Sequence, residues 1–128
     1  MILALVDDLM FRSKIKSAAQ QAGVAVTFAG SRDGALSAMR ANTPALVIFD
    51  LNNMRGDPLG TLAEMKKDAA LTAIPTVGYV SHVDVSTIEA ARTAGVDEVL
   101  ARSAFTVRLA ELVAHPPPRS GQGGGRAE

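Results

Sequence analysis

Five short and almost wholly apolar segments constrain the fold of this chain more than any other feature of its sequence. They are Ile2–Val6, Val24–Phe28, Ala45–Phe49, Thr76–Val80 and Glu98–Ala101. Apolar residues fill most of these segments instead of alternating with polar ones, which is typical of strands covered on both faces. Because such strands belong to parallel sheets, the sequence predicts a parallel sheet of five strands.

Helical patterns separate the apolar segments. An apolar stripe runs from Met10 to Ala22 and ends at Gly23, a residue that commonly terminates helices. Later helices are expected to begin at Ser31, Asp57 and Ser103, and the fourth helix is expected to end at Gly95. Strands and helices that alternate in this way predict a doubly wound α/β fold, a βα unit repeated five times with helices on both faces of the sheet.

The length of 128 residues is that of one domain, which we expect over residues 1–114. From His115 onward the chain reads HPPPRSGQGGGRAE. Proline stiffens the first part of this segment, and glycine and polar residues loosen the rest. The composition therefore predicts a flexible tail over residues 115–128.

Charge and composition argue against several classes of protein. Thirteen basic and thirteen acidic side chains give a formal net charge of zero, which disfavours general binding to nucleic acid or to a membrane surface. The chain has no cysteine, hence no disulfide framework and no thiol nucleophile. Its first apolar run is far shorter than a signal-peptide core or a membrane span of about 20 residues. We therefore expect a cytoplasmic protein.

Polar residues follow four of the five predicted strands, at the edge where a doubly wound sheet binds its ligands. In chain order they are Asp7 and Asp8, then Asp50, Asn52 and Asn53, then Ser81 and His82, and finally Arg102. Carboxylate and carbonyl oxygens suit Mg²⁺, and a cation would relieve the repulsion between the acids. A single polar residue at a strand end is more simply explained by solvent exposure. Their convergence from several strands is what points to a site.

Other chemistries find little support in the sequence. No glycine-rich phosphate loop follows the first strand. A general base at His82 beside Ser81 would lack a third group to orient it. Tyr79, the only tyrosine, is expected to fill its strand. The chain is therefore not expected to be an enzyme, although a small-molecule binder or hydrolase that uses the same pocket stays an alternative.

Two segments, Ala45–Asp50 and Gly95–Leu100, resemble parts of the receiver domains of bacterial response regulators. Asp7 and Ile74-Pro75 match the same pattern, Arg102 falls at its last site position, and the resemblance extends from Met1 to about Ala114. It implies the flavodoxin-like receiver fold, in which an aspartate after the third strand accepts a phosphoryl group. In that family an acidic pair, this aspartate and one backbone carbonyl hold Mg²⁺.

Position by position, the resemblance implies that Asp50 is the phosphoacceptor and that Asp7 is a direct metal ligand. Asn52 matches the residue that lends its backbone carbonyl to the metal. Val6 stands where the first acid of the pair belongs, and the extra acid comes one place after the pair, at Asp8. The candidate metal ligands are therefore Asp7, Asp8, Asp50 and Asn52, and we expect Mg²⁺ to bind weakly.

The phosphate and switch positions depart from the family pattern. Val80 replaces a hydroxyl residue, with Ser81 one place late, while Val99 replaces an aromatic residue and Arg102 a lysine. Val80 keeps the shape of threonine but lacks its hydroxyl. A hydrogen bond from such a donor to a charged group contributes about 1.5–3 kcal/mol. Arg102 is expected either to hold a phosphoryl group or to clamp Asp50 directly.

These departures predict a pseudo-receiver. By this we mean an atypical response-regulator receiver in bacterial two-component (phosphorelay) signal transduction, acting mainly as a protein–protein interaction and regulatory module with weak or absent phosphorylation. The alternative is a functional phosphoacceptor, phosphorylated at Asp50 in a Mg²⁺-dependent manner. The resemblance implies a histidine kinase or an output protein as partner. It also implies a homodimer through the fourth helix, fifth strand and fifth helix, here about Thr87–Arg92 and Arg108–Val113. No direct contact with nucleic acid or a membrane is expected.

Overall fold

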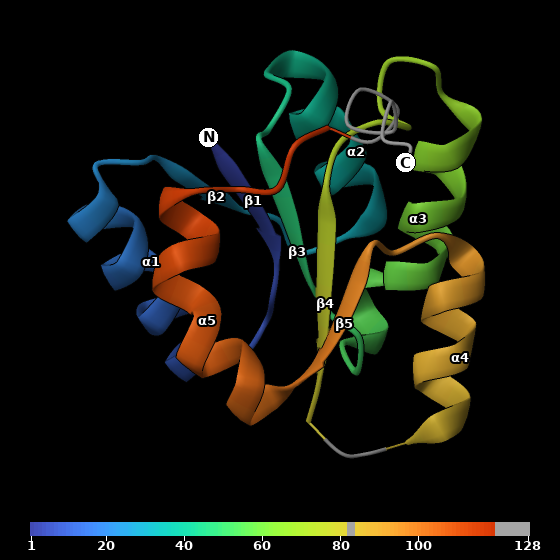
Figure 1. Cartoon of the computed structure of the whole chain (residues 1–128). Helices are drawn as coiled ribbons and strands as arrows, with labels where there is room; N and C mark the ends of the chain where they lie inside the picture. The colour runs from blue at the N-terminus through green and yellow to red at the C-terminus, as the bar shows by residue number, and fades with distance from the viewer. Residues whose placement is uncertain (82–83, 120–128) are drawn as a thin grey trace.

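The computed structural model describes residues 1–81 and 84–119 and confirms the predicted α/β architecture (Figure 1). The strands are β1 (Ile2–Leu5), β2 (Val26–Phe28), β3 (Leu46–Asp50), β4 (Thr76–Val80) and β5 (Glu98–Ala101). The helices are α1 (Leu9–Ala22), α2 (Arg32–Ala41), α3 (Pro58–Lys67), α4 (Val85–Ala94) and α5 (Arg102–Ala114), with a short 3-10 helix η1 (Met54–Gly56) before α3. None of the helices in the described ranges is long and apolar enough to cross a membrane.

All strand pairs of the sheet are parallel, and the strand order is β2-β1-β3-β4-β5. From β1 the chain first adds β2 on one side and then β3, β4 and β5 on the other. The sheet is therefore doubly wound, with its topological switch between β1 and β3. The carboxyl ends of these two strands flank the crevice where ligands of such sheets bind.

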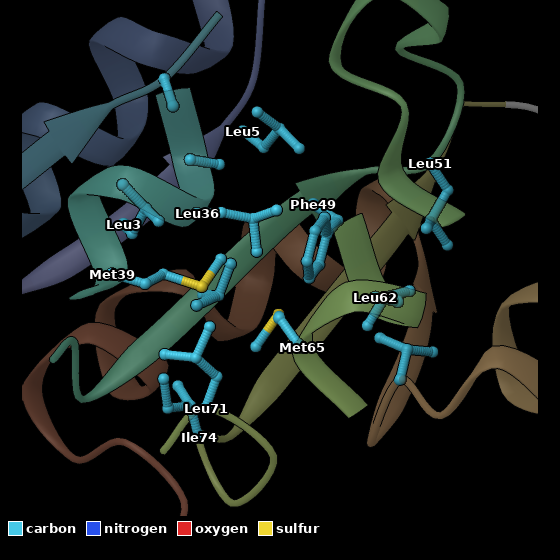
Figure 2. Packing of buried hydrophobic residues seen from close by; sticks show 14 of the residues in the cluster. Leu3, Leu5, Leu36, Met39, Phe49, Leu51, Leu62, Met65, Leu71 and Ile74 are labelled. Atoms are coloured by element: carbon cyan, nitrogen blue, oxygen red, sulfur yellow. The ribbon is translucent and has the colours of Figure 1, made fainter. Parts of the chain in front are cut away.

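Helices cover both faces of the sheet, as predicted: α1 and α5 lie on one face, and α2, α3 and α4 on the other (Figure 1). Successive residues of β1 alternate between the two cores. Leu3 and Leu5 join the α2–α3–α4 core, which Figure 2 shows with Phe49 and Met65 at its centre. The intervening residues Ile2 and Ala4 enter the α1–α5 core, so burial on both faces explains the nearly continuous apolar strands.

Several helix ends lie where the sequence signals place them. Gly23 adopts a left-handed conformation (φ 70°) after α1, and its N–H donates to the carbonyls of Ala19 and Gln20. The Ser31 hydroxyl caps α2 by accepting from the N–H of Gly34. The Asp57 carboxylate caps α3 in the same manner.

Ser103 does not cap the last helix, so that prediction was wrong. Helix α5 begins at Arg102, directly after β5, and its N-cap residue Ala101 makes no side-chain hydrogen bond. The strand passes into the helix without an intervening loop, which leaves Ser103 inside the first turn, where its side chain is too late in the helix to cap it.

The expected second strand is also shorter than its apolar segment. Val24 N–H donates to the carbonyl of Ala19 and thereby belongs to the end of α1, while pairing with β1 starts at Val26. At the other end of the chain, Pro116–Pro118 run past the amino ends of the strands beside Met1 and Pro44 (Figure 1). The remainder of the expected tail, residues 120–128, lies outside the described residues.

Candidate functional site

Asp50 is the last residue of β3 and lies at the carboxyl edge of the sheet, beside the topological switch. Its Oδ1 accepts a hydrogen bond of 3.0 Å from the Asn52 N–H. Partial burial raises the pKa of Asp50, and the nearby charge of Asp8 adds to this. The Asn52 N–H, the Arg102 charge and, least of the three, the Tyr79 hydroxyl lower the pKa without cancelling the rise. Asp50 therefore lies in a site that does not fully compensate its negative charge.

Asp8 serves the fold directly, as the N-cap of α1. Its Oδ1 accepts from the N–H groups of Met10 (2.8 Å) and Phe11 (3.2 Å). Its Oδ2 lies 3.7 Å from Nη2 of Arg102. Both oxygens of this carboxylate are thus engaged by protein groups. The sequence carried a sign of this role, because aspartate immediately before a helix is a preferred cap.

Asp7 lies between two arginines. Its Oδ1 is 3.8 Å from Nη2 of Arg12, and its Oδ2 is 3.5 Å from Nη1 of Arg55. Arg12 is held in place because its Nε donates to the carbonyl of Val6 at 2.6 Å. The sequence analysis missed both arginines. Arg12 stands about one helical turn beyond the acidic pair and was detectable on that ground, whereas nothing local links Arg55 to Asp7.

The site therefore gathers three carboxylates and three guanidinium groups. Its acids are Asp7, Asp8 and Asp50, and its arginines are Arg12, Arg55 and Arg102. Fixed protein cations thus balance the charge that a divalent cation would otherwise neutralise. Within residues 1–81 and 84–119, no cluster of three or more His, Cys, Asp or Glu is arranged to hold a metal ion. The residues present do not form a ready Mg²⁺ site.

Arg102 does not form an ion pair with Asp50. Its charged group pairs with Asp8 and lies over the ring of Phe11, 4.5 Å from the ring centroid. The direct clamp on Asp50, one of the two expectations for this arginine, is therefore not the arrangement observed. Asp50 still experiences the positive charge, which partly lowers its pKa.

Asn52 connects the loop after β3 to the end of β4. Its side-chain Oδ1 accepts a hydrogen bond of 2.8 Å from the N–H of Ser81. Ser81 is half-buried at this edge, and His82 lies outside the described residues. The neighbouring Asn53 is buried and braces the loop, since its Oδ1 accepts from Gly56 N–H and its Nδ2 donates to the Leu5 carbonyl. The amides at this edge thus organise the loops.

The two switch positions are apolar and belong to the packing of the α2–α3–α4 face. Val80 is 2% exposed and part of that core, and Val99 packs against it. Neither valine supplies a hydrogen bond from its side chain to Asp50. The polar and ionic contacts around the acids come instead from α1, the β3–α3 loop and the start of α5.

Tyr79 was expected to fill its strand, and its ring does so. The ring packs against Phe11 and Phe105 in the α1–α5 core, with centroid distances of 5.0 and 4.7 Å, and the two phenylalanine rings are themselves 6.2 Å apart. Its hydroxyl, however, is buried without a hydrogen-bond partner among the described residues. Burial and the nearby charges of Asp50 and Asp8 raise the pKa of this phenol. Sequence inspection had no means of finding this polar group beside Asp50.

No protein-family model and no curated protein matches the chain. Solved structures do match it. The phosphorylated cyanobacterial phytochrome response regulator RcpA superposes with a TM-score of 0.73 at 24% identity, covering 88% of this chain and 87% of RcpA. The receiver domain of NtrX from Brucella abortus gives 0.73 at 22% identity, covering 91% and 100%. The chemotaxis response regulator CheY4 of Vibrio cholerae gives 0.74 at 16% identity, covering 88% and 96%. The chain therefore has the fold of response-regulator receiver domains.

Proposed function

We propose that the chain is an atypical receiver in bacterial two-component (phosphorelay) signal transduction. It acts mainly as a protein–protein interaction and regulatory module in the cytoplasm, with weak or absent phosphorylation and no enzymatic turnover of its own. The fold shared with response regulators supports the signalling role. The observation that carries the atypical character is the pairing of Asp7 and Asp8 with arginines instead of a free acidic pair.

The arginines weaken any Mg²⁺ site for two reasons. A cation entering between the acids would first have to separate Asp7 from Arg12 and Arg55. It would also have to approach three guanidinium charges at close range in a partly buried site, where charges repel more strongly than in water. The Mn²⁺-bound form of the response regulator Rcp1, a structure similar to this chain (TM-score 0.74, 16% identity), is an instance of this fold that does bind a divalent metal.

The apolar switch positions support the same proposal. A phosphoryl group on Asp50 would find no hydroxyl at Val80, whose side chain is buried in the α2–α3–α4 core. At Val99 no aromatic ring is present to change position. Population shifts need differential contacts between two states, and about 1.4 kcal/mol changes a population tenfold. Without these contacts, phosphorylation would shift the conformational equilibrium on the α4 side of the domain only slightly.

Spectroscopy of the labelled protein tests the proposal. With Mg²⁺ and beryllium fluoride, or with acetyl phosphate, the amide NMR spectrum is expected to stay essentially unchanged. Saturable shifts around Asp50 would contradict weak or absent phosphorylation.

The role of the arginines can be tested separately with Arg55→Gln. The Arg55 side chain is 83% exposed, so this change leaves the core intact and frees Asp7 from one of its two partners. We expect Mg²⁺ to shift the amides near Asp7 more strongly in Arg55→Gln than in the wild type. Arg40→Gln is the matched control. Arg40 is an exposed arginine on α2, and it pairs with Asp68, which follows α3. Equal Mg²⁺ responses in all three proteins would show that arginines do not limit metal binding.

A functional phosphoacceptor is the second candidate, and the position of Asp50 favours it. Asp50 lies at the end of β3 and has no ion-pair partner in the part of the chain that the structure describes. The similar RcpA structure is that of a phosphorylated response regulator. A phosphorylated species that forms with Mg²⁺ and a phosphodonor and disappears in Asp50→Asn would establish this candidate over the first.

The proposed partners are a histidine kinase or an output protein, and a second copy of the chain. The homodimer would use α4, β5 and α5, where an ion pair between Glu98 and Arg108 joins β5 to α5. Light scattering after size exclusion tests this face. A mass of two chains is expected, and a single-chain mass at high concentration would argue against the homodimer.

A further inference from the structure

The Tyr79 hydroxyl lacks a geometrically formed hydrogen bond in an interior whose other buried polar side chains are paired among the described residues. It is the only side-chain polar atom in the described residues that is buried without a hydrogen-bond partner. Buried hydroxyl groups in folded proteins nearly always have a partner, because an unpaired one has lost its water without replacement. The phenol therefore needs an acceptor close to its present position.

The aromatic stack restricts which acceptors the hydroxyl can reach. The Tyr79 ring is held in a cluster with Phe11 and Phe105, and the guanidinium of Arg102 lies over the Phe11 ring. A large movement of the phenol would break this stack. The acceptor must consequently come to the hydroxyl from the carboxyl edge of the sheet.

Asp50 is the acceptor that the geometry supplies. Asp50 and Tyr79 are direct partners in the parallel pairing of β3 with β4, and so their side chains lie on the same face of the sheet. Among the charged groups whose field reaches the phenol, Asp8 already uses both oxygens, for its cap and for Arg102. Asp50 uses one oxygen for the Asn52 N–H, and its carboxylate lies close enough to the Tyr79 hydroxyl for each group to change the pKa of the other.

We propose that Tyr79 is a positioning residue for Asp50, its hydroxyl donating to the second carboxylate oxygen after a small rotation of the Asp50 side chain. With the Asn52 N–H on the other oxygen, the carboxylate is then held from two sides. The proposal concerns the unmodified carboxylate, so it holds whether or not Asp50 can accept a phosphoryl group.

The proposed contact also changes which face of the sheet responds to a change at Asp50. The hydroxyl absent at Val80 would have faced the α2–α3–α4 core, whereas Tyr79 belongs to the α1–α5 core through Phe11 and Phe105. Any ligand, metal or covalent group that draws Asp50 away removes the acceptor from Tyr79. The change is then felt at α1 and α5 instead of at α4.

The intrinsic fluorescence of the chain tests this contact directly, because the protein has one tyrosine and no tryptophan. A hydrogen bond from a phenol to a carboxylate quenches its emission and shifts its near-ultraviolet absorption to longer wavelength. At neutral pH we expect Asp50→Ala to increase the emission and to remove the red shift. Asp50→Asn should act in the same direction, since an amide oxygen is a weaker acceptor than a carboxylate.

Asp8→Asn is the matched control, because it removes a neighbouring negative charge and keeps an oxygen that can cap α1. It should leave the emission and absorption of Tyr79 as in the wild type. Unchanged spectra in both Asp50 variants would overturn the proposal, as would an equal change in Asp8→Asn. Circular dichroism of each variant confirms that its fold is retained, and Asp50→Asn serves if Asp50→Ala does not fold.

Discussion

Asp8 can act either as a helix cap or as a metal ligand, and substitutions at this residue distinguish the two roles. Its carboxylate accepts from the N–H groups of Met10 and Phe11 at the start of α1. Losing a side-chain cap typically costs about 1 kcal/mol, within a range of about 0.5–2 kcal/mol. The ion pair with Arg102, 3.7 Å long and between side chains 39% and 44% exposed, contributes at most about 0.5 kcal/mol after solvent screening.

Two substitutions at this position therefore differ in a predictable way. Asp8→Ala removes the cap and the charge, and should lower the free energy of unfolding by about 1–1.5 kcal/mol, or roughly 4 °C in Tm. Asparagine caps helices as well as aspartate, so Asp8→Asn loses only the weak ion pair. It also relieves the repulsion that Asp8 exerts on Asp50, and its net change should stay below about 0.5 kcal/mol.

Urea unfolding of the wild type and both variants, with and without Mg²⁺, measures these differences. If Asp8→Asn were as unstable as Asp8→Ala, the negative charge and not the cap would be what Asp8 contributes. If Mg²⁺ stabilised the wild type but not Asp8→Asn, Asp8 would be a metal ligand, and the assignment of its oxygens to the fold would be refuted.

Three further predictions concern Asp50, Val80 and Phe105. Burial raises the pKa of Asp50 above its ordinary value of 3.8, so the folded protein binds a proton at Asp50 more tightly than the unfolded chain does. The stability contributed by this site therefore falls as the pH rises from 3.8 through the raised pKa of the folded protein. Asp50→Asn, which keeps an acceptor for the Asn52 N–H, should therefore be more stable than the wild type at pH 7. In urea titrations its advantage should vanish below about pH 3.8; an advantage that persisted there would point to a cause other than ionisation. Val80→Thr buries a hydroxyl at a site 2% exposed and should cost about 1–3 kcal/mol without creating a response to beryllium fluoride; a stable variant that gained such a response would show that the missing hydroxyl alone silences the switch. Phe105→Ala removes a fully buried ring from the stack on Tyr79 and should cost about 3–5 kcal/mol in thermal or urea unfolding, together with a weaker near-ultraviolet dichroism of Tyr79; a loss below about 1 kcal/mol would mean that the stack contributes little.

The order of strands and helices was readable from the sequence because its signals are local. Nearly continuous apolar runs mark strands buried on both faces, and Gly23, Ser31 and Asp57 end or begin helices through contacts within a few residues. The placement of Asp50 at the carboxyl edge followed from the same pattern, since it comes directly after an apolar strand. The local signal at Ser103 failed because β5 passes into α5 without a loop.

Two of the partners of the acids, Arg55 and Arg102, were decided only by the tertiary structure. Arg55 meets Asp7, and Arg102 meets Asp8, across loops that are far apart in the sequence. An ion pair depends on distances of a few ångströms between side chains, and no periodicity in the sequence encodes such distances. The sequence by itself thus determined a receiver-like sheet with an aspartate at its edge. Folding determined that arginines surround the neighbouring acids and that a buried tyrosine hydroxyl lies beside that aspartate.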